Sequence, residues 1–201
     1  MLYSPLPAGL VTVLADQPFL IETPRLILRQ WENSDRDAFA SMNADPRVMR
    51  YFTKALSRAE SDEFLDRVSG LIKQKGWGFW AVEVKGEASL AGMVGLHEQT
   101  PDFTYPSCIE VGWRFVPERW GKGYAAEAAR AALEVGFTRL EMEEIVAFTT
   151  VSNTRSQKVM RFIGMKNKGD IFQHPRVPEG HPLRTHVLYR LSNHEWKSDN
   201  S

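Results

Sequence analysis

The chain has 201 residues and a mass of 22.9 kDa, which suits one ordinary domain with a substantial buried core. Its 25 basic and 25 acidic side chains give a formal net charge of zero, which argues against a global attraction to nucleic acid or to an anionic membrane. The hydrophobic fraction of 43% argues against disorder, and the single cysteine, Cys108, argues against an intrachain disulfide or a thiolate metal cage. No Lys or Arg precedes Arg25, which argues against a secretory leader. A folded cytoplasmic protein is therefore expected.

The N-terminal part of the chain reads as an irregular extension followed by the first structured elements. Residues 1–19 are rich in proline and glycine, and the domain is expected to begin near residue 20. A first strand is predicted at Arg25–Trp31. Ser34, with Asp37 three residues later, predicts the start of a short helix.

The next region predicts two helical segments and a pair of strands. A helical turn is expected at Val48–Phe52, after Asp45-Pro46. Ser57 and Glu60 form a clear capping-box pattern, and Gly76 is a natural end for the helix that they open. Two strands that pair antiparallel across a turn at Gly86 are predicted next, at Trp77–Lys85 and Leu90–Glu98.

The middle of the chain contains the strand that carries most of the candidate chemistry. A loop at Thr100–Ser107 precedes a predicted strand at Cys108–Val116. Alternation along this strand places Ile109, Val111, Trp113 and Phe115 on one face. Glu110 lies on the opposite face and is the only carboxylate of the strand.

The C-terminal half continues with alternating helices and strands. Helices are predicted at Ala125–Leu140 and at Asn153–Ile163, the second ended by Gly164. Strands are predicted at Glu144–Val151, Met165–Phe172 and Arg184–Leu191, with a loop at His174–Pro182. The order predicts an α/β fold around a mixed sheet, with a domain at 20–195 and a tail at 196–201.

The sharpest local signal is the glycine-rich segment Trp120-Gly-Lys-Gly-Tyr-Ala-Ala126 between a strand and a helix. Unbonded N–H groups at a helix N-terminus attract anions, and glycine lets a phosphate approach the backbone, although a simple strand-to-helix turn remains open. No P-loop pattern is present. The dinucleotide pattern Gly-x-Gly-x-x-Ala does match, but the acidic residue expected at the end of the following strand is missing.

Six short segments occur in the order found in one family. They are Thr23-Pro-Arg-Leu-Ile-Leu-Arg29, Asp45-Pro-Arg-Val-Met49, Glu110-Val-Gly-Trp113, Gly121-Lys-Gly-Tyr-Ala125, Asn153-Thr-Arg-Ser156 and Phe162-Ile-Gly-Met165. Over roughly residues 20–195 the chain resembles the GNAT superfamily of acyl-CoA-dependent N-acetyltransferases. It is most similar to the subgroup that includes ribosomal-protein-alanine acetyltransferases. The resemblance implies the GNAT fold and direct transfer of an acetyl group from acetyl-CoA to a primary amine in a ternary complex.

The resemblance also implies which residues bind acetyl-CoA. The pyrophosphate is expected on the backbone of the glycine-rich loop, and the pantetheine arm on the preceding strand and at the start of a later helix. In this sequence those positions are Gly121, Lys122, Gly123, Tyr124 and Ala125 for the loop, Phe115 and Val116 for the strand, and Asn153 for the helix. No metal is implied, because the histidines match no zinc spacing.

Acetyl transfer needs a neutral amine and a stabilised leaving thiolate, and two residues are candidates for these roles. Glu110 is the best candidate for the general base, with His97 as the alternative. Ser156 is the hydroxyl near the position where many family members carry a Tyr that protonates the thiolate. Met160 occupies that position here and cannot donate a proton.

Several alternatives stay open from the sequence. The fold could serve as a non-catalytic acyl-CoA sensor, and the glycine pattern leaves an NAD-dependent oxidoreductase as a remote reading. The acceptor, a small molecule or a peptide N-terminus, is not named by the sequence, although Met49–Ala55 and Gln173–Leu183 are expected to shape its pocket. A homodimer is expected only by analogy with the family.

Overall fold

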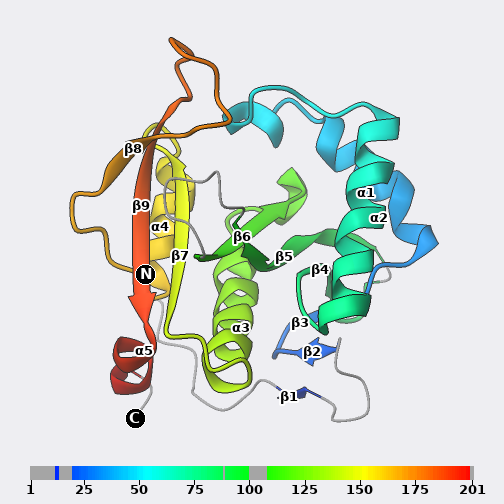
Figure 1. The fold of residues 1–201 in the computed structure, drawn as a ribbon. Helices are drawn as coiled ribbons and strands as arrows, with labels where there is room; N and C mark the ends of the chain where they lie inside the picture. Colours follow the sequence, from blue (N-terminus) through cyan, green and yellow to red (C-terminus); the bar gives the residue numbers. More distant parts are fainter. Residues whose placement is uncertain (1–11, 14–19, 88, 100–107, 200–201) are drawn as a thin grey trace.

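A nine-stranded mixed sheet forms the centre of the computed structural model, which describes residues 12–13, 20–87, 89–99 and 108–199 (Figure 1). The strand order is β1-β2-β3-β4-β5-β6-β7-β9-β8. Neighbouring strands are antiparallel except β6 and β7, which are parallel. The strands are β1 Thr12–Val13, β2 Ile21–Glu22, β3 Leu26–Arg29, β4 Phe79–Val84, β5 Leu90–Glu98, β6 Ile109–Phe115, β7 Glu144–Thr150, β8 Ile171–Gln173 and β9 Thr185–Ser192. The predicted mixed α/β fold is therefore confirmed.

Helices cover both faces of this sheet. In Figure 1, α1 and α2 pack together beside β4 and β5, while α3 runs along β5 and β6. The Cδ1 atom of Leu96 lies 3.2 Å from the Cβ position of Gly136 in α3, so His97, the next residue of β5, faces the opposite side of the sheet. The helices are α1 Arg36–Ala44, α2 Arg58–Lys75, α3 Tyr124–Thr138, α4 Thr154–Phe162 and α5 Asn193–Asp199, with 3-10 turns η1 Asn33–Asp35, η2 Met49–Tyr51 and η3 Pro117–Arg119.

Helix α2 begins and ends where the sequence predicts. The Glu60 N–H bonds to the Ser57 hydroxyl at 3.3 Å, and the Ser57 N–H bonds to the Glu60 carboxylate at 2.8 Å. Gly76 closes the helix with φ of +80° and an N–H bond to the Ile72 carbonyl at 2.8 Å. One face of α2 then buries Leu65, Val68 and Ile72 against the sheet. The capping box and the glycine end are thus both confirmed.

Helix α3 lies close to the sheet because its inner face is made of alanine. Ala128, Ala129, Ala131 and Ala132 are all buried. Small side chains let the helix axis approach the strands, and Gly136 permits the closest contact, since a Cβ there would lie 2.5 Å from Ile145. This packing fixes the N-terminus of α3 under the end of β6.

Two local predictions are wrong. The first 3-10 turn is capped by Glu32 and Asp35 rather than by Ser34, because these two carboxylates make the reciprocal bonds to the backbone. The strand predicted at Met165–Phe172 is reduced to a single bridge at Lys166 and the short β8. Gly169, at φ of +91°, turns the chain between them.

The ends of the predicted domain differ from expectation in one respect. Helix α5 continues past residue 195, where a tail was expected, and its Trp196 packs on Phe137 with ring centroids 5.5 Å apart. Most of the predicted extension at 1–19 and the whole predicted loop at 100–107 lie outside the described residues. No helix in the described part of the chain combines the length and the apolar character that a bilayer span requires.

Candidate active site

An open groove of about 1870 Å³ crosses the sheet where β6 and β7 part. The two strands pair only at Ile109–Ile145 and Glu110–Val146, whereas β5 pairs with β6 along its full length. Beyond Glu110 the edge of β6 therefore faces the groove instead of a neighbouring strand. Because a pocket for one drug-sized ligand measures roughly 300–1,000 Å³, this groove has room for two ligands side by side.

The backbone of β6 presents alternate residues to the groove. The Cys108 carbonyl and the Val116 N–H bond to Gln99 and Ala91 on the β5 side. In an antiparallel pair, every second residue directs its backbone N–H and C=O groups to the same neighbouring strand. The backbone groups of the even-numbered residues of β6 therefore point toward β5. The N–H groups of Trp113 and Phe115 consequently point toward the side where β7 has diverged. The Phe115 carbonyl accepts a bond from the Trp120 indole at 2.8 Å.

The glycine-rich loop forms a turn with exposed backbone donors at the start of α3. Gly121 and Gly123 have φ angles of +73° and +81°, which only glycine adopts without strain. The first N–H to bond into the helix is that of Glu127, which reaches the Gly123 carbonyl at 3.1 Å. The preceding N–H groups have no intrahelical partner, and the helix dipole adds positive potential there. The loop has the geometry of an anion cradle.

A buried carboxylate holds this loop in place. Glu127 accepts hydrogen bonds from the Thr23 hydroxyl at 2.6 Å and from the Arg25 Nε at 2.6 Å. Arg25 in turn donates to the Lys122 carbonyl at 2.9 Å, and its guanidinium stacks over the Tyr124 ring. Thr23 and Arg25, in the turn before β3, are thereby connected to Lys122 in the loop and to Glu127 in the first turn of α3.

At the opposite wall of the groove, Asn153 organises the start of α4. Its side-chain oxygen accepts from the Ser156 N–H at 3.2 Å. Its amide nitrogen donates to the Thr149 hydroxyl at 2.9 Å and to the Ser156 hydroxyl at 3.0 Å. The Ser156 oxygen is therefore an acceptor in this network, which leaves its own proton available for donation. Met160 is buried in the core and takes no part.

Glu110 lies in the groove on the face of β6 opposite the core-facing Val111. The Gln99 amide donates a hydrogen bond to its carboxylate, and His97 is its register partner on β5. Burial raises the pKa of Glu110 to about 8, against the opposing effects of Gln99 and Arg176. A carboxyl with this pKa is poised to exchange a proton near neutral pH. Burial lowers the pKa of His97, and the charges of Arg176 and Arg67 lower it further. The imidazole is therefore neutral near pH 7 and can act as a base.

The predicted site residues come together around this groove. Eight of the ten line it, at Glu110, Phe115, Gly121, Gly123, Tyr124, Ala125, Asn153 and Ser156. Lys122 and Val116 lie beside the lining, and the Val116 N–H is already bonded to Ala91. Both segments expected to shape an acceptor pocket also contribute, through Tyr51 and Phe52 from one and His174 and Val177 from the other.

Three residues in or beside the groove are missing from the sequence prediction. Gln99 and Arg114 line the groove and contact Glu110 and Asn43, respectively. Glu127 secures the glycine-rich loop from below. For Arg114 a signal does exist, because it lies four residues after Glu110 on the same face of an alternating strand. For Glu127 the signal is a carboxylate within a run of buried alanines.

The remaining chemically active side chains have other surroundings. Burial and the charge of Glu110 raise the pKa of Cys108, which disfavours the thiolate that an acyl carrier needs. His174 and His186 stack with ring centroids 4.7 Å apart. Within the described ranges, no three His, Cys, Asp or Glu side chains are grouped to hold a metal ion.

Comparisons with known proteins agree with this geometry. Residues 25–166 match the family model described as the acetyltransferase (GNAT) domain. YnaD of Bacillus subtilis (strain 168), named as an uncharacterized N-acetyltransferase, is 30% identical over 88% of this chain and 98% of its own. A GNAT-family acetyltransferase from Bacillus anthracis superimposes with a TM-score of 0.74, 28% identity and coverage of 88% of this chain and 99% of its own. A ribosomal-protein-S5-alanine acetyltransferase from Vibrio fischeri shares the fold at a TM-score of 0.69 and 20% identity, over 88% and 98% of the two chains.

Proposed function

The chain belongs to the GNAT acetyltransferase family, and we propose that it transfers an acetyl group from acetyl-CoA directly to a primary amine in a ternary complex. The observation that carries the proposal is the continuous path in the groove from the glycine-rich loop, along the unpaired edge of β6, to Glu110. We extend the catalytic unit from residue 20 to α5, since Trp196 packs on Phe137 of α3.

The two walls of the groove suit the two ends of acetyl-CoA. In our proposal the N–H groups from Gly121 to Ala125 bind the pyrophosphate. The N–H groups of Trp113 and Phe115 bind the pantetheine amides, as an added strand would. Asn153 lies across the gap from them on α4, within reach of the same arm. Arg155 and Lys158, also on α4, supply positive charge for the remaining phosphates.

The proposed reaction proceeds by attack of the neutral amine on the thioester carbonyl. Glu110, as the carboxylate, takes the proton that the amine nitrogen loses when its bond to carbon forms. A backbone N–H of β6 stabilises the negative oxygen of the tetrahedral intermediate. The carbon–sulfur bond then breaks, and the Ser156 hydroxyl donates a hydrogen bond to the departing thiolate.

Calorimetric titration with acetyl-CoA tests the proposal, with NADH as the comparison ligand. We expect micromolar binding of acetyl-CoA, no binding of NADH, and release of CoA when an amine acceptor is added. Gly123→Ala should weaken acetyl-CoA binding, because φ at this position is +81° and the new Cβ would meet the Arg25 guanidinium at 3.3 Å. Gly169→Ala is the matched control, with φ of +91° in a turn that does not line the groove.

The other readings predict different results in the same experiment. Acetyl-CoA binding without turnover over a broad amine panel would indicate a sensor of acyl-CoA. Binding of NADH in place of acetyl-CoA would indicate an oxidoreductase and would refute the proposal. Equal losses in Gly123→Ala and Gly169→Ala would show that the effect is structural and not a property of the cradle.

A further inference from the structure

The groove is strongly basic although the whole chain is neutral. Among the described residues, its lining contains seven arginines and one lysine but a single carboxylate, Glu110. Two of these arginines are already neutralised, because Arg47 pairs with Asp45 and Arg119 pairs with Glu87. Arg155 and Lys158 lie on α4, on the acetyl-CoA side of the proposed site. The other basic residues still need an explanation.

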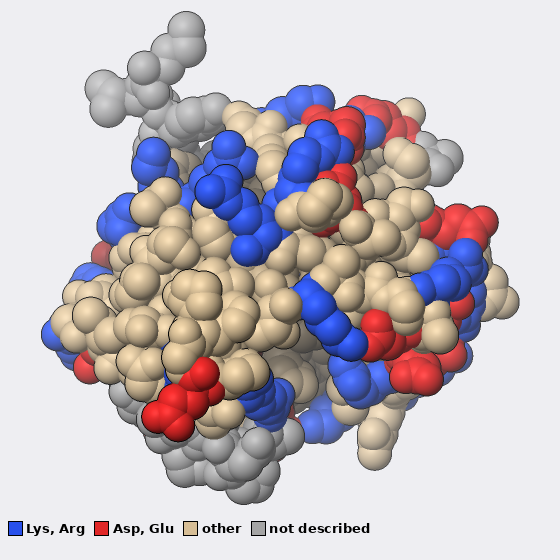
Figure 2. All heavy atoms as spheres, turned by 90° about the horizontal axis from the view of Figure 1, so that it is seen from above, with Lys and Arg blue, Asp and Glu red and all other residues tan. Residues whose placement is uncertain are grey.

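Those residues surround the acceptor side of the groove. Arg50 comes from η2, Arg67 from α2, Arg114 from β6 and Arg176 from the loop before β9. Figure 2 looks down on this end of the molecule and shows basic side chains gathered over its centre. Burial lowers the pKa of His97 and His174, and the positive charge of Arg176 lowers both further; at Glu110 the same charge opposes the rise in pKa that burial causes. A second cationic group on the acceptor would be repelled here.

Arg114 lies at the bottom of this basic region. Its Nη1 donates to the neutral side-chain oxygen of Asn43, and its guanidinium lies 4.3 Å above the Phe52 ring. The Nε atom is buried and has no hydrogen-bond partner in the described part of the chain. Burial without a carboxylate partner lowers the pKa of Arg114 to about 10. A cation held in this way, without a carboxylate partner, is stabilised by an anion that approaches its guanidinium from the groove.

Between Glu110 and Arg114 the face of β6 is covered by the Phe79 ring, which lines the groove there. Both side chains project from the same face of β6, about 13 Å apart at their Cα atoms for a separation of four strand residues. Gly112 lies between them and contributes no side chain; a Cβ there would meet the Phe79 ring at 3.2 Å. A short molecule that lies over the Phe79 ring would have one end near Glu110 and the other near Arg114.

We propose that the acceptor is a primary amine that also carries a carboxylate, which Arg114 binds while the amine lies at Glu110. The inference rests on the proposed function, since it names the substrate class of the same site. It excludes polyamines and aminoglycosides as preferred acceptors, because their additional positive charges would face Arg67 and Arg114. The carboxylate favours an amino acid or a compound of that type.

A matched series of acceptors tests the proposal. Linear ω-amino acids, alkylamines of equal chain length and the corresponding diamines share an amine of similar basicity but differ in the charge of the far end. We expect kcat/KM for the best ω-amino acid to exceed that of its alkylamine by roughly 10-fold or more, with the diamine lowest. A diamine that reacts as well as the amino acid would overturn the proposal.

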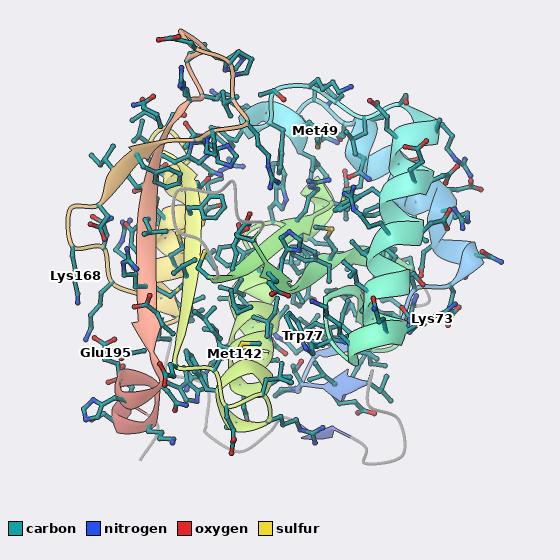
Figure 3. The ribbon with its side chains drawn as sticks, in the orientation of Figure 1. Met49, Lys73, Trp77, Met142, Lys168 and Glu195 are labelled. Carbon is teal, nitrogen blue, oxygen red and sulfur yellow. The ribbon has the colours of Figure 1, made fainter. Side chains whose placement is uncertain are left out.

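Variants assign the preference to particular residues. Arg114→Gln should remove the preference for the amino acid, because kcat/KM for the ω-amino acid should fall by a larger factor than kcat/KM for the alkylamine. Arg67→Gln, at an exposed position, should reduce the discrimination against diamines and does not disturb the core. The control is Lys168→Gln, because Lys168 points outward from the loop between α4 and β8, away from the groove (Figure 3). If Lys168→Gln alters the ratio as much as Arg114→Gln, the preference is a global charge effect.

Binding of a carboxylate without an amine separates this inference from the proposed function. Linear alkanoates titrated into the CoA-loaded protein should bind more tightly than the equivalent alcohols, and Arg114→Gln should abolish the difference. This result is expected even if no acceptor is acetylated. Acetylation of neutral and cationic amines without any alkanoate binding would refute the inference and leave the proposed function intact.

Discussion

Replacing Glu110 by glutamine should affect stability and activity in opposite directions. In the unfolded chain the carboxyl has a pKa of 4.5, whereas in the folded protein burial raises it to about 8. Below pH 4.5 both states hold the proton, and between these values only the folded state does. The folded protein therefore loses stability as the pH rises from 4.5 to 8, by at most about 5 kcal/mol. Glutamine has no proton to lose and keeps a hydrogen-bonding partner in Gln99.

The variant Glu110→Gln should thus be as stable as the parent at pH 4.5 and more stable by a few kcal/mol at pH 9. Urea unfolding at several pH values measures this difference. Acetyl transfer by the same variant should fall by roughly 10²–10⁴-fold and lose the pH inflection near 8, since the general base is gone. A variant that is less stable than the parent at pH 9 would refute the burial argument. A variant that keeps its activity would assign the base to His97 or to a water molecule.

Four further substitutions test separate parts of the structure. Ser156→Ala should lower kcat about 10-fold and leave the KM for acetyl-CoA nearly unchanged, because Asn153 still caps the Ser156 N–H; steady-state kinetics would show a raised KM if Ser156 acts in binding instead. Glu127→Gln should lower the free energy of unfolding in urea by about 1–3 kcal/mol and should weaken acetyl-CoA binding measured by calorimetry. An unchanged affinity would mean that the glycine-rich loop keeps its shape without Glu127. Gly95→Ala should lower the free energy of unfolding by several kcal/mol, because its Cβ would lie 1.9 Å from the Gly78 carbonyl oxygen. Gly70→Ala in α2 should raise it by about 0.5–1 kcal/mol. Equal effects of the two substitutions in urea unfolding would contradict the packing.

The fold could be predicted from the sequence wherever the signals are local. The capping box at Ser57 and Glu60 fixes the start of α2 through bonds between residues three apart. Alternation in β6 places Glu110 opposite the core face, as the structure confirms. The segment Met165–Phe172 has a suitable composition for a strand, but it pairs in register with β9 only at Lys166 and from Ile171 onward. Pairing of this kind depends on residues 14 to 24 positions away, which local patterns do not encode.

The candidate site could be located from the sequence but not completed. The glycine-rich loop and Asn153 are recognised by motifs within short segments, and the structure brings both to one groove. Gln99 and Arg114 matter because of where β5 and β6 pair and where Asn43 of α1 approaches them. Strand alternation places Arg114 on the same face as Glu110, but the contacts of both side chains are made across the fold and cannot be predicted from spacing in the chain.

The parting of β6 from β7 explains why one short strand can serve two ligands. On its β7 side, β6 offers backbone donors that have lost a strand partner, and these suit the amides of an extended arm. On its groove face, it carries the carboxyl group of Glu110 and the guanidinium group of Arg114, with Gly112 between them. A strand paired on both edges could provide the second set but not the first. In the proposed complex, the same two-residue pairing at the start of β6 would determine both the direction from which acetyl-CoA enters and the side from which its acceptor approaches.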